Sequence, residues 1–333
     1  MQAVVTERID TESWRSASRV PAQAKMLVVG QYKLIQEIGH GAMGVAWLAQ
    51  DLYADRKVCL KLLPQEREIR DSDVQQMKTT FRLTHRLQHQ HLCPHIQFAI
   101  DPQIGPFLVM KYYNGCSLTK LCQPEAGHRR IFSLADALRV LSPVADGLDY
   151  LHAQGLVHRD IKPGNIVMGR RHRDVQIVDF GMVEKYGALA ATNRHLGGTP
   201  HYLAPEIWGG GAASPESDQY ALATVAYELL AGHRPFDQYS SATALMISVK
   251  TAVVPQISQL SDDINAVLQR GLAKAPLDRF PTCRAFVKAL RAALLLNQES
   301  DGLRVVNLED TILLSDGDTP RSELMVRPTA QVG

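Results

Sequence analysis

The spacing of apolar residues changes its period near Ser117, and this change limits the folds that the chain can adopt. Before that point, apolar residues occur in short or alternating runs separated by glycine, proline and charged residues, which is typical of strands and turns. The expected strands span residues 33–38, 45–49, 58–63, 96–100 and 107–112. One stretch, Ser72 to Gln88, is expected to form a helix among them. A β-rich part followed by a helical part predicts an α+β protein with two lobes.

After Ser117 the apolar residues recur at steps of three and four, as they do along one face of a helix. The apolar residues from Leu134 to Leu151 follow this spacing, and Pro143 is expected to kink or break that helix. Three further helices, one almost wholly apolar and two amphipathic, are expected at residues 220–230, 264–272 and 286–296. The second lobe is therefore expected to be mainly helical.

The composition is that of an ordinary globular protein, with 45% apolar and 21% charged residues. A formal net charge of +2 gives no reason to expect nucleic acid or an anionic membrane as a partner. The five cysteines are scattered and never form a C-x-x-C pair, which favours free thiols in a reducing compartment. No apolar run approaches the roughly twenty residues of a membrane-spanning helix. We therefore expect a cytoplasmic protein without a membrane partner.

Two terminal segments lack the patterns of a folded domain. Residues 1–29 are polar and unpatterned, which predicts a flexible arm, and the stretch from Met1 to Lys25 lacks the apolar run of a signal peptide. Residues 297–333 are first acidic and then contain proline and threonine, which predicts a disordered tail. The folded domain is therefore expected to span residues 30–296.

Two strings in the second part carry reactive side chains. Residues 158–165 read HRDIKPGN, and residues 179–181 read DFG. Phosphoryl transfer from a metal-bound nucleotide requires a group that orients the attacking hydroxyl, ligands for the divalent metal, and positive charge on the phosphates. The side chains suited to this chemistry are Asp160 as the acceptor of the hydroxyl proton, Lys162 as the positive charge, and Asn165 and Asp179 as the metal ligands.

Near the start of the β-rich part, residues 39–44 read GHGAMG, which is a G-x-G-x-x-G string. The same string begins dinucleotide-binding folds, in which the glycines lead into a helix. Here Val45 to Leu48 continues as a strand. We therefore expect a hairpin whose glycines let backbone N–H groups approach phosphate oxygens. A dinucleotide-binding oxidoreductase is the less favoured alternative, because no helix follows the glycines.

These strings resemble those of the eukaryotic-type (Hanks-type) protein kinase family, and they are similar in style to its bacterial serine/threonine members. The resemblance implies a bilobal fold, with a small antiparallel sheet lobe at residues 30–110, a hinge at 111–115 and a larger helical lobe at 116–296. It also implies ATP and Mg²⁺ or Mn²⁺ as cofactors, with transfer of the γ-phosphoryl group to a protein substrate. In the family, a lysine at the position of Lys162 accompanies serine and threonine substrates.

The resemblance further implies a nucleotide site. Lys61 ends the strand Val58-Cys59-Leu60-Lys61, which is similar to the family's V-A-I-K string, and it would act in catalysis by binding the α- and β-phosphates. Met110 would lie at the back of the adenine pocket, and Lys111 replaces an acid that the family commonly has there. The ATP-binding residues implied are Ile38, Gly39, Gly41, Gly44, Ala46, Cys59, Lys61, Met110 and Tyr112.

Three more residues match structural positions of the family. Glu206, in the string Ala204-Pro205-Glu206, is expected to form a buried ion pair with Arg279 in the string Leu277-Asp278-Arg279-Phe280. Asp218 is expected to brace the backbone of the catalytic loop. Because these residues lie far apart along the chain, their joint presence extends the resemblance over about residues 31–296.

The segment between Gly181 and Pro205 is expected to regulate the protein, as in the family it resembles. Arg159 precedes the proposed base and is expected to receive a phosphothreonine, for which Thr192 is the candidate. That Thr192 is only an exposed loop residue stays an open alternative. Thr199 is expected to contact Asp160 and Lys162 and to shape the substrate groove. Autophosphorylation or a transient dimer is a further expectation.

One residue that the resemblance requires is missing. Kinases of this family pair the strand lysine with a glutamate of the next helix. Spacing from Lys61, and from the string Leu87-Gln88-His89, places Thr80 at that position. No aspartate or glutamate occurs between Val74 and Ile100.

Three interpretations of the missing acid stay open. Another acid, such as Asp179, pairs with Lys61, and catalysis continues. Alternatively, the protein is a nucleotide-binding pseudokinase that serves as an interaction module. In the third interpretation, Asp73 or Glu68 supplies the ion pair after a distortion. The first interpretation is favoured because every other catalytic position is intact.

Overall fold

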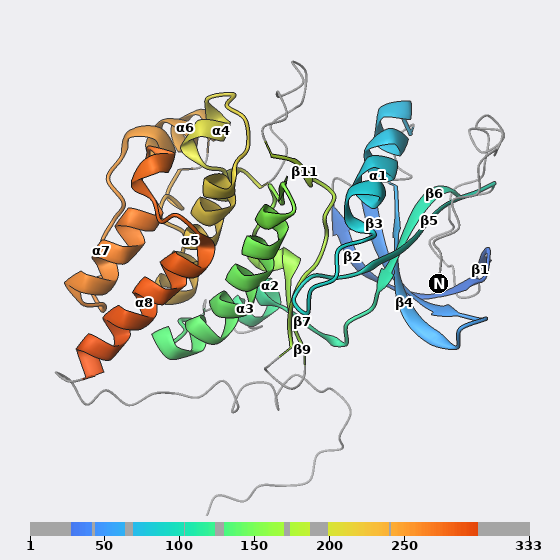
Figure 1. Cartoon of the computed structure of the whole chain (residues 1–333), viewed down its shortest axis with the longest axis horizontal. Coiled ribbons are helices and arrows are strands. Elements are labelled where there is room, and N and C mark those ends of the chain that lie inside the picture. The colour runs from blue at the N-terminus through green and yellow to red at the C-terminus, as the bar shows by residue number, and fades with distance from the viewer. Residues whose placement is uncertain are drawn as a thin grey trace, which may run out of the picture.

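The computed structural model describes residues 28–41, 44–63, 69–102, 104–123, 130–169, 174–186, 199–239 and 241–298. A sheet part lies at the right of Figure 1 and a helical part at the left. The α+β, two-lobed architecture expected from the change in apolar spacing is therefore confirmed.

The sheet part contains six strands in the order β1-β2-β3-β4-β6-β5, and every neighbouring pair is antiparallel. The strands are β1 (Val28–Val29), β2 (Tyr32–Gly41), β3 (Gly44–Asp51), β4 (Arg56–Leu62), β5 (His95–Asp101) and β6 (Gly105–Lys111). The last five match the five expected strands. Strand β1 was not expected, and it begins two residues before the anticipated domain start at residue 30.

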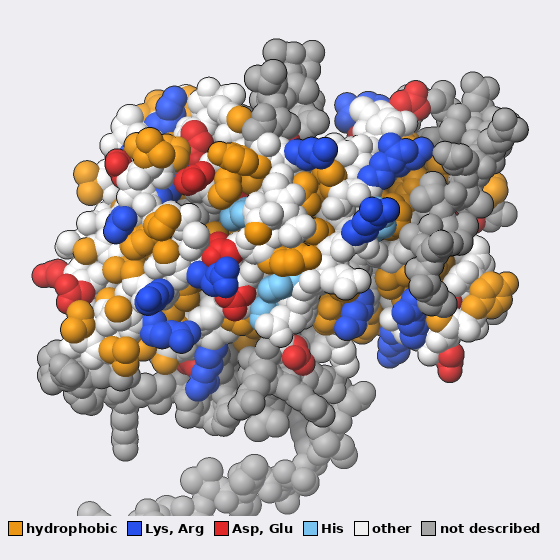
Figure 2. Space-filling view, in the orientation of Figure 1, with side chains coloured by type: hydrophobic (Ala, Val, Ile, Leu, Met, Phe, Trp, Pro, Cys, Tyr) orange, Lys and Arg blue, Asp and Glu red, His pale blue; other side chains and the backbone are white. Residues whose placement is uncertain are grey.

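The one helix of the sheet part, α1 (Asp71–Thr84), contacts strands β5 and β6. Its buried face includes Met77 and Phe81. The outward face of its second half carries two basic residues, the half-buried Lys78 and the exposed Arg82, which are four positions apart and so lie on the same side of the helix. Figure 2 shows Lys and Arg side chains over this region. The helix ends four residues earlier than expected, since the Leu87 N–H bonds to the Thr84 carbonyl (3.0 Å) and closes a turn.

The helical part contains α2 (Leu118–Cys122), α3 (Leu134–Ala153), α4 (Pro205–Trp208), α5 (Pro215–Ala231), α6 (Ala242–Thr251), α7 (Asp262–Gly271) and α8 (Cys283–Gln298). Two small sheets join it, one with the strands β7 (Gly115–Ser117), β9 (Ile166–Gly169) and β10 (Val175–Ile177), the other with β8 (Leu156–Val157) and β11 (Glu184–Lys185). These short strands carry the loops that line the cleft described below.

The expected helices are present, but two details differ from expectation. Helix α3 runs without a break through Pro143. The packing of its buried stripe, which includes Leu141 and Val144, outweighs the one backbone hydrogen bond that proline cannot make. Helix α6 was not expected, because only a few of its residues, such as Leu245 and Val249, are buried and its apolar pattern is weak. None of the described helices is long and apolar enough to cross a membrane.

Candidate functional site

A cleft of about 890 Å³ lies between the sheet part and the helical part. Ligand sites for small molecules commonly have volumes of about 300–1,000 Å³. The expected residues that line it are Ile38, Gly39, Gly41, Gly44, Ala46, Cys59, Lys61, Met110, Tyr112, Asp160, Lys162, Asn165, Asp179 and Thr199. Thr192, the candidate phosphosite, lies outside the described residues.

The glycine string forms a hairpin between β2 and β3, as expected from the strand that follows it. Gly41 pairs with Gly44 across the hairpin. Gly44 has a φ of +132°, and a Cβ atom there would lie 2.0 Å from the Leu62 carbonyl oxygen. Only glycine fits that position without moving backbone. Gly39 and Gly41 have room for a Cβ atom, so steric fit alone does not require glycine at these two positions.

Part of the cleft lining is apolar. Cys59 on β4 pairs in register with the buried Met110 on β6, and both line the cleft. Burial raises the pKa of the Cys59 thiol to about 12, so the thiol stays neutral. Cys93 also lines the cleft, and sequence reasoning had given it no role there. At the hinge, the Lys111 ammonium lies 4.9 Å from the centre of the Tyr113 ring, a cation–π contact in place of the acid common in the resembling family.

Lys61 and Asp179 form an ion pair across the cleft. Burial would raise the pKa of Asp179, but the Lys61 ammonium and the Gly181 N–H outweigh it, and the pKa falls to about 2. Asp179 therefore carries a full negative charge at neutral pH. Its backbone has a φ of +62°, a conformation that non-glycine residues adopt only when the surroundings enforce it.

The catalytic-loop residues form one hydrogen-bonded group. The Lys162 ammonium donates to Asp160 Oδ2 (2.8 Å) and to Thr199 Oγ1 (2.9 Å), as expected for Thr199. The Asn165 amide nitrogen donates to Asp160 Oδ2 (2.9 Å) and to the Asp160 carbonyl (2.8 Å). Asp160 Oδ1 has no hydrogen-bond partner within the described part of the chain. One carboxylate oxygen is therefore fixed and the other remains available.

Phe180 anchors the loop that carries Asp179. Its ring is buried between the rings of His95 (centroids 5.4 Å apart) and His158 (5.2 Å). Burial lowers the pKa of both histidines, that of His95 to about 3, so both rings are neutral at physiological pH. Two neutral imidazoles pack against Phe180 as flat, largely apolar surfaces. Sequence reasoning had given His95 no role.

The catalytic loop is fixed from behind by Asp218 of α5. This buried carboxylate accepts the backbone N–H groups of His158 and Arg159 (2.8 Å each) and a hydrogen bond from His152 Nε2 (2.9 Å). Burial would raise the pKa of Asp218, but the bond from His152 and the other donors outweigh it and lower it. Arg159, with a φ of +69°, is thereby held in a strained backbone conformation next to Asp160.

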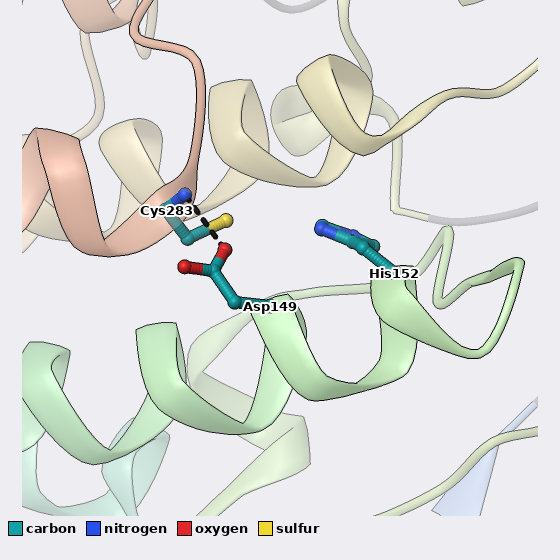
Figure 3. Close-up of side chains that lie close together, drawn as sticks. All are labelled: Asp149, His152 and Cys283. Carbon is teal, nitrogen blue, oxygen red and sulfur yellow. Dashed lines mark hydrogen bonds between the residues drawn. The ribbon is translucent and has the colours of Figure 1, made fainter.

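A nearby group of three side chains, Asp149, His152 and Cys283, is the one place where the described residues gather three possible metal ligands (Figure 3). Their hydrogen bonds indicate a structural role. Asp149 accepts the backbone N–H groups of Cys283 (2.9 Å) and Arg284 (3.1 Å) and so caps the start of α8. Burial raises the pKa of the Cys283 thiol, which keeps it protonated.

Glu206 and Arg279 form the expected buried ion pair. Arg279 Nη1 and Nη2 donate to the two carboxylate oxygens of Glu206 (2.8 and 2.7 Å), which is a bidentate contact. The Arg279 side chain is fully buried, and Ser217 adds a third hydrogen bond to Glu206 (2.9 Å). This pair connects α4 to the segment between α7 and α8.

Arg159 differs from expectation, because its guanidinium already contacts a carboxylate. Arg159 Nη1 donates to Glu184 on β11 (2.7 Å), and both side chains are largely buried. A bare arginine awaiting a phosphate was expected here. Sequence reasoning missed Glu184, for which the only signal was an acid five residues after Asp179.

The position where the family has a helix acid is occupied by Thr80. Thr80 is buried on α1, and its hydroxyl has no partner within the described residues. Asp73 lies in the first turn of α1, where it accepts hydrogen bonds from Arg70 (3.0 and 3.2 Å). Glu68 lies outside the described residues. The acidic partner of Lys61 among the described residues is therefore Asp179, which is the pair that the first interpretation expected.

A family model described as "Protein kinase domain" matches residues 32–290. Among curated proteins, the chain is 31% identical over 292 residues to serine/threonine-protein kinase Pkn1 of Myxococcus xanthus, covering 84% of this chain and 41% of that protein. It is 32% identical over 268 residues to serine/threonine-protein kinase PknA of Mycobacterium tuberculosis, covering 79% and 61% respectively. The chain thus spans about half the length of the curated relatives it matches.

Among solved structures, the kinase domain of Mycobacterium tuberculosis PknI is similar, with a TM-score of 0.64 and 27% sequence identity. The match covers 82% of this chain and 99% of that domain. The bilobal fold predicted from the sequence is thus confirmed by structural similarity to a solved kinase domain.

Proposed function

The chain belongs to the protein kinase family, and we propose that it transfers the γ-phosphoryl group of ATP to serine or threonine residues of proteins. The observation that carries this proposal is the cleft in which Asp160, Lys162, Asn165, Asp179 and Lys61 meet. Membership of the family implies ATP and a divalent metal ion in general. That the metal is Mg²⁺ or Mn²⁺ is part of our proposal.

The residues at the cleft are suited to a divalent cation. Asp179 supplies a carboxylate that stays ionised, with its pKa near 2. The Asn165 side-chain nitrogen makes two hydrogen bonds to Asp160, and its amide oxygen is not used in either of them. Carboxylate and amide oxygens are the ligands that Mg²⁺ prefers. When bound, the metal would neutralise charge on the nucleotide phosphates.

The remaining groups of the cleft have separate tasks in the proposed reaction. Lys61 neutralises the phosphates at the sheet side of the cleft. Asp160 Oδ1 accepts the proton of the substrate hydroxyl, since Oδ2 is occupied by Lys162 and Asn165. Lys162, two residues after Asp160, compensates charge on the transferred group and joins Thr199 at the substrate groove. This arrangement supports serine and threonine as acceptors.

The absence of an acid at Thr80 does not favour the pseudokinase alternative. Lys61 has Asp179 as its partner, and the curated relatives are named as serine/threonine kinases. We propose Thr192 as a regulatory phosphosite and autophosphorylation as its source. A phosphate there would compete with Glu184 for Arg159, because that guanidinium is already paired. The five free cysteines support the cytoplasm as the proposed location.

Transfer of radiolabel from γ-labelled ATP to a general protein substrate tests the proposed activity. Wild type, Asp160→Asn and Asp263→Asn are each assayed in the presence of Mg²⁺ and in the presence of a chelator. Asp263→Asn is the matched control, because Asp263 is an exposed residue of α7. Loss of a general base typically lowers a rate by about 10²–10⁴-fold. We expect Asp160→Asn to lose labelling by that factor and the control to retain it. Equal labelling by all three proteins would exclude phosphotransfer at this site.

A further inference from the structure

Helix α1 has no carboxylate that reaches the cleft. Its only acids, Asp71 and Asp73, lie in the first turn, where Asp73 contacts Arg70. Thr80 lies on the buried face but has no partner for its hydroxyl within the described residues. The usual connection between this helix and Lys61, an ion pair, is therefore not made. Besides the packing of α1 on β5 and β6, a different contact joins the helix to the loop that carries Asp179.

Gln76 makes such a contact. Its side-chain nitrogen donates a hydrogen bond to the backbone carbonyl of Gly181 (3.1 Å), a residue 105 positions later in the chain. Gln76 precedes Thr80 by four residues, so the two side chains lie on the same face of the helix, one turn apart. Helix α1 is thus bonded to the loop that carries Asp179 rather than to Lys61.

Both polar groups of the Gly181 residue are thereby engaged. Its N–H donates to Asp179 Oδ1 (3.0 Å), and its carbonyl accepts from Gln76. The Asp179 backbone has a strained, positive φ, which persists only where neighbouring contacts enforce it. Displacement of Gly181 would therefore change the direction of the Asp179 carboxylate.

We propose that Gln76 is a positioning residue that orients Asp179 for metal binding by bonding to the Gly181 carbonyl. The inference rests on the proposed role of Asp179 as a metal ligand. The chemistry of the side chain is specific, because an amide N–H donates to a carbonyl whereas a carboxylate repels it. Gln76→Glu keeps the shape of the side chain but replaces the donating amide with a carboxylate that repels the Gly181 carbonyl oxygen. Gln76→Met removes the donor and leaves no charge.

Binding of a fluorescent ATP analogue, with Mg²⁺ varied from none to saturation, tests the proposal without relying on turnover. The matched control is Gln75→Glu, an identical charge change on the exposed neighbour. One neutral hydrogen bond corresponds to roughly a two- to tenfold change in an equilibrium constant. We expect both Gln76 variants to need about five- to tenfold more Mg²⁺ for half-maximal enhancement of binding. Metal-free binding should be unchanged, since Gln76 does not line the cleft.

Two outcomes would overturn the proposal. One is wild-type Mg²⁺ dependence in both Gln76 variants. The other is an equal loss of metal-free and metal-dependent binding, which would make Gln76 a general support of the fold. The proposed phosphotransfer activity is refuted by a different result, in which the wild type binds the Mg²⁺–nucleotide complex but transfers no phosphate. In that case the binding comparison still decides the role of Gln76. Rescue of normal Mg²⁺ dependence in Gln76→Glu by acidic pH, which protonates the carboxyl into a donor, would add support.

Discussion

The buried ion pair between Glu206 and Arg279 leads to the sharpest prediction on stability. Arg279 makes five hydrogen bonds, two to Glu206 and three to backbone carbonyls of Ala273, Lys274 and Glu216. Its side chain has no exposed surface. Arg279→Met would leave the Glu206 carboxylate largely buried without its counter-charge. Removing one member of such a pair costs about 3–5 kcal/mol.

Thermal unfolding followed by circular dichroism measures this cost. In a domain of this size, 1 kcal/mol corresponds to about 2–4 °C in Tm, so Arg279→Met should lower Tm by roughly 6–20 °C. Arg82→Met is the control, because Arg82 is exposed on α1 and its loss should change stability by less than about 0.5 kcal/mol. The double variant Glu206→Gln/Arg279→Met should lose less free energy of unfolding than the sum of the losses in the two single variants. Strict additivity would refute the coupling that we infer.

Two further predictions follow from other ion pairs. The pKa of Asp179 is lowered from 3.8 to about 2, so its pairing with Lys61 stabilises the fold at neutral pH, and this contribution declines as the pH falls from about 4 to 2. The difference in urea midpoint between wild type and Lys61→Met should therefore shrink over that range, and a constant difference would contradict the assignment. Glu184→Ala leaves the largely buried Arg159 without its carboxylate, so a phosphate would be the remaining anion to pair with it. Phosphatase treatment should therefore lower the phosphotransfer rate of this variant several-fold more than that of wild type. Equal sensitivity to phosphatase would show that Glu184 does not substitute for a phosphate.

The candidate catalytic residues could be located from the sequence because they occur in contiguous strings. Asp160, Lys162 and Asn165 occur within six positions, and the hydrogen bonds among them are local. The sheet was predictable for a related reason, since alternation along each strand reports which face is buried. Gly44 shows the same principle, because a G-x-G-x-x-G string followed by a strand requires a tight hairpin.

The contacts that sequence reasoning missed join distant positions through ordinary residues. Gln76 bonds to a backbone carbonyl, which any residue carries, so nothing at position 181 marks the pair. Glu184 meets Arg159 only because β11 pairs with β8. Pro143 illustrates a different limit, since a local helix-breaking signal was outweighed by the packing of α3. In each case tertiary packing determines the structure, and the local preferences of the sequence do not predict the outcome.

The cap that Asp149 provides for α8 also bears on how the protein is made. The carboxylate lies on α3, whereas the N–H groups it accepts belong to residues 134 and 135 positions later. During synthesis from the N-terminus, α3 exists long before its partner helix. Until Cys283 and Arg284 emerge, burial of Asp149 would strand a charge in an apolar interface. The helical lobe therefore gains its full stability only after translation has passed α8, so a nascent chain stopped before that point should remain open to proteases.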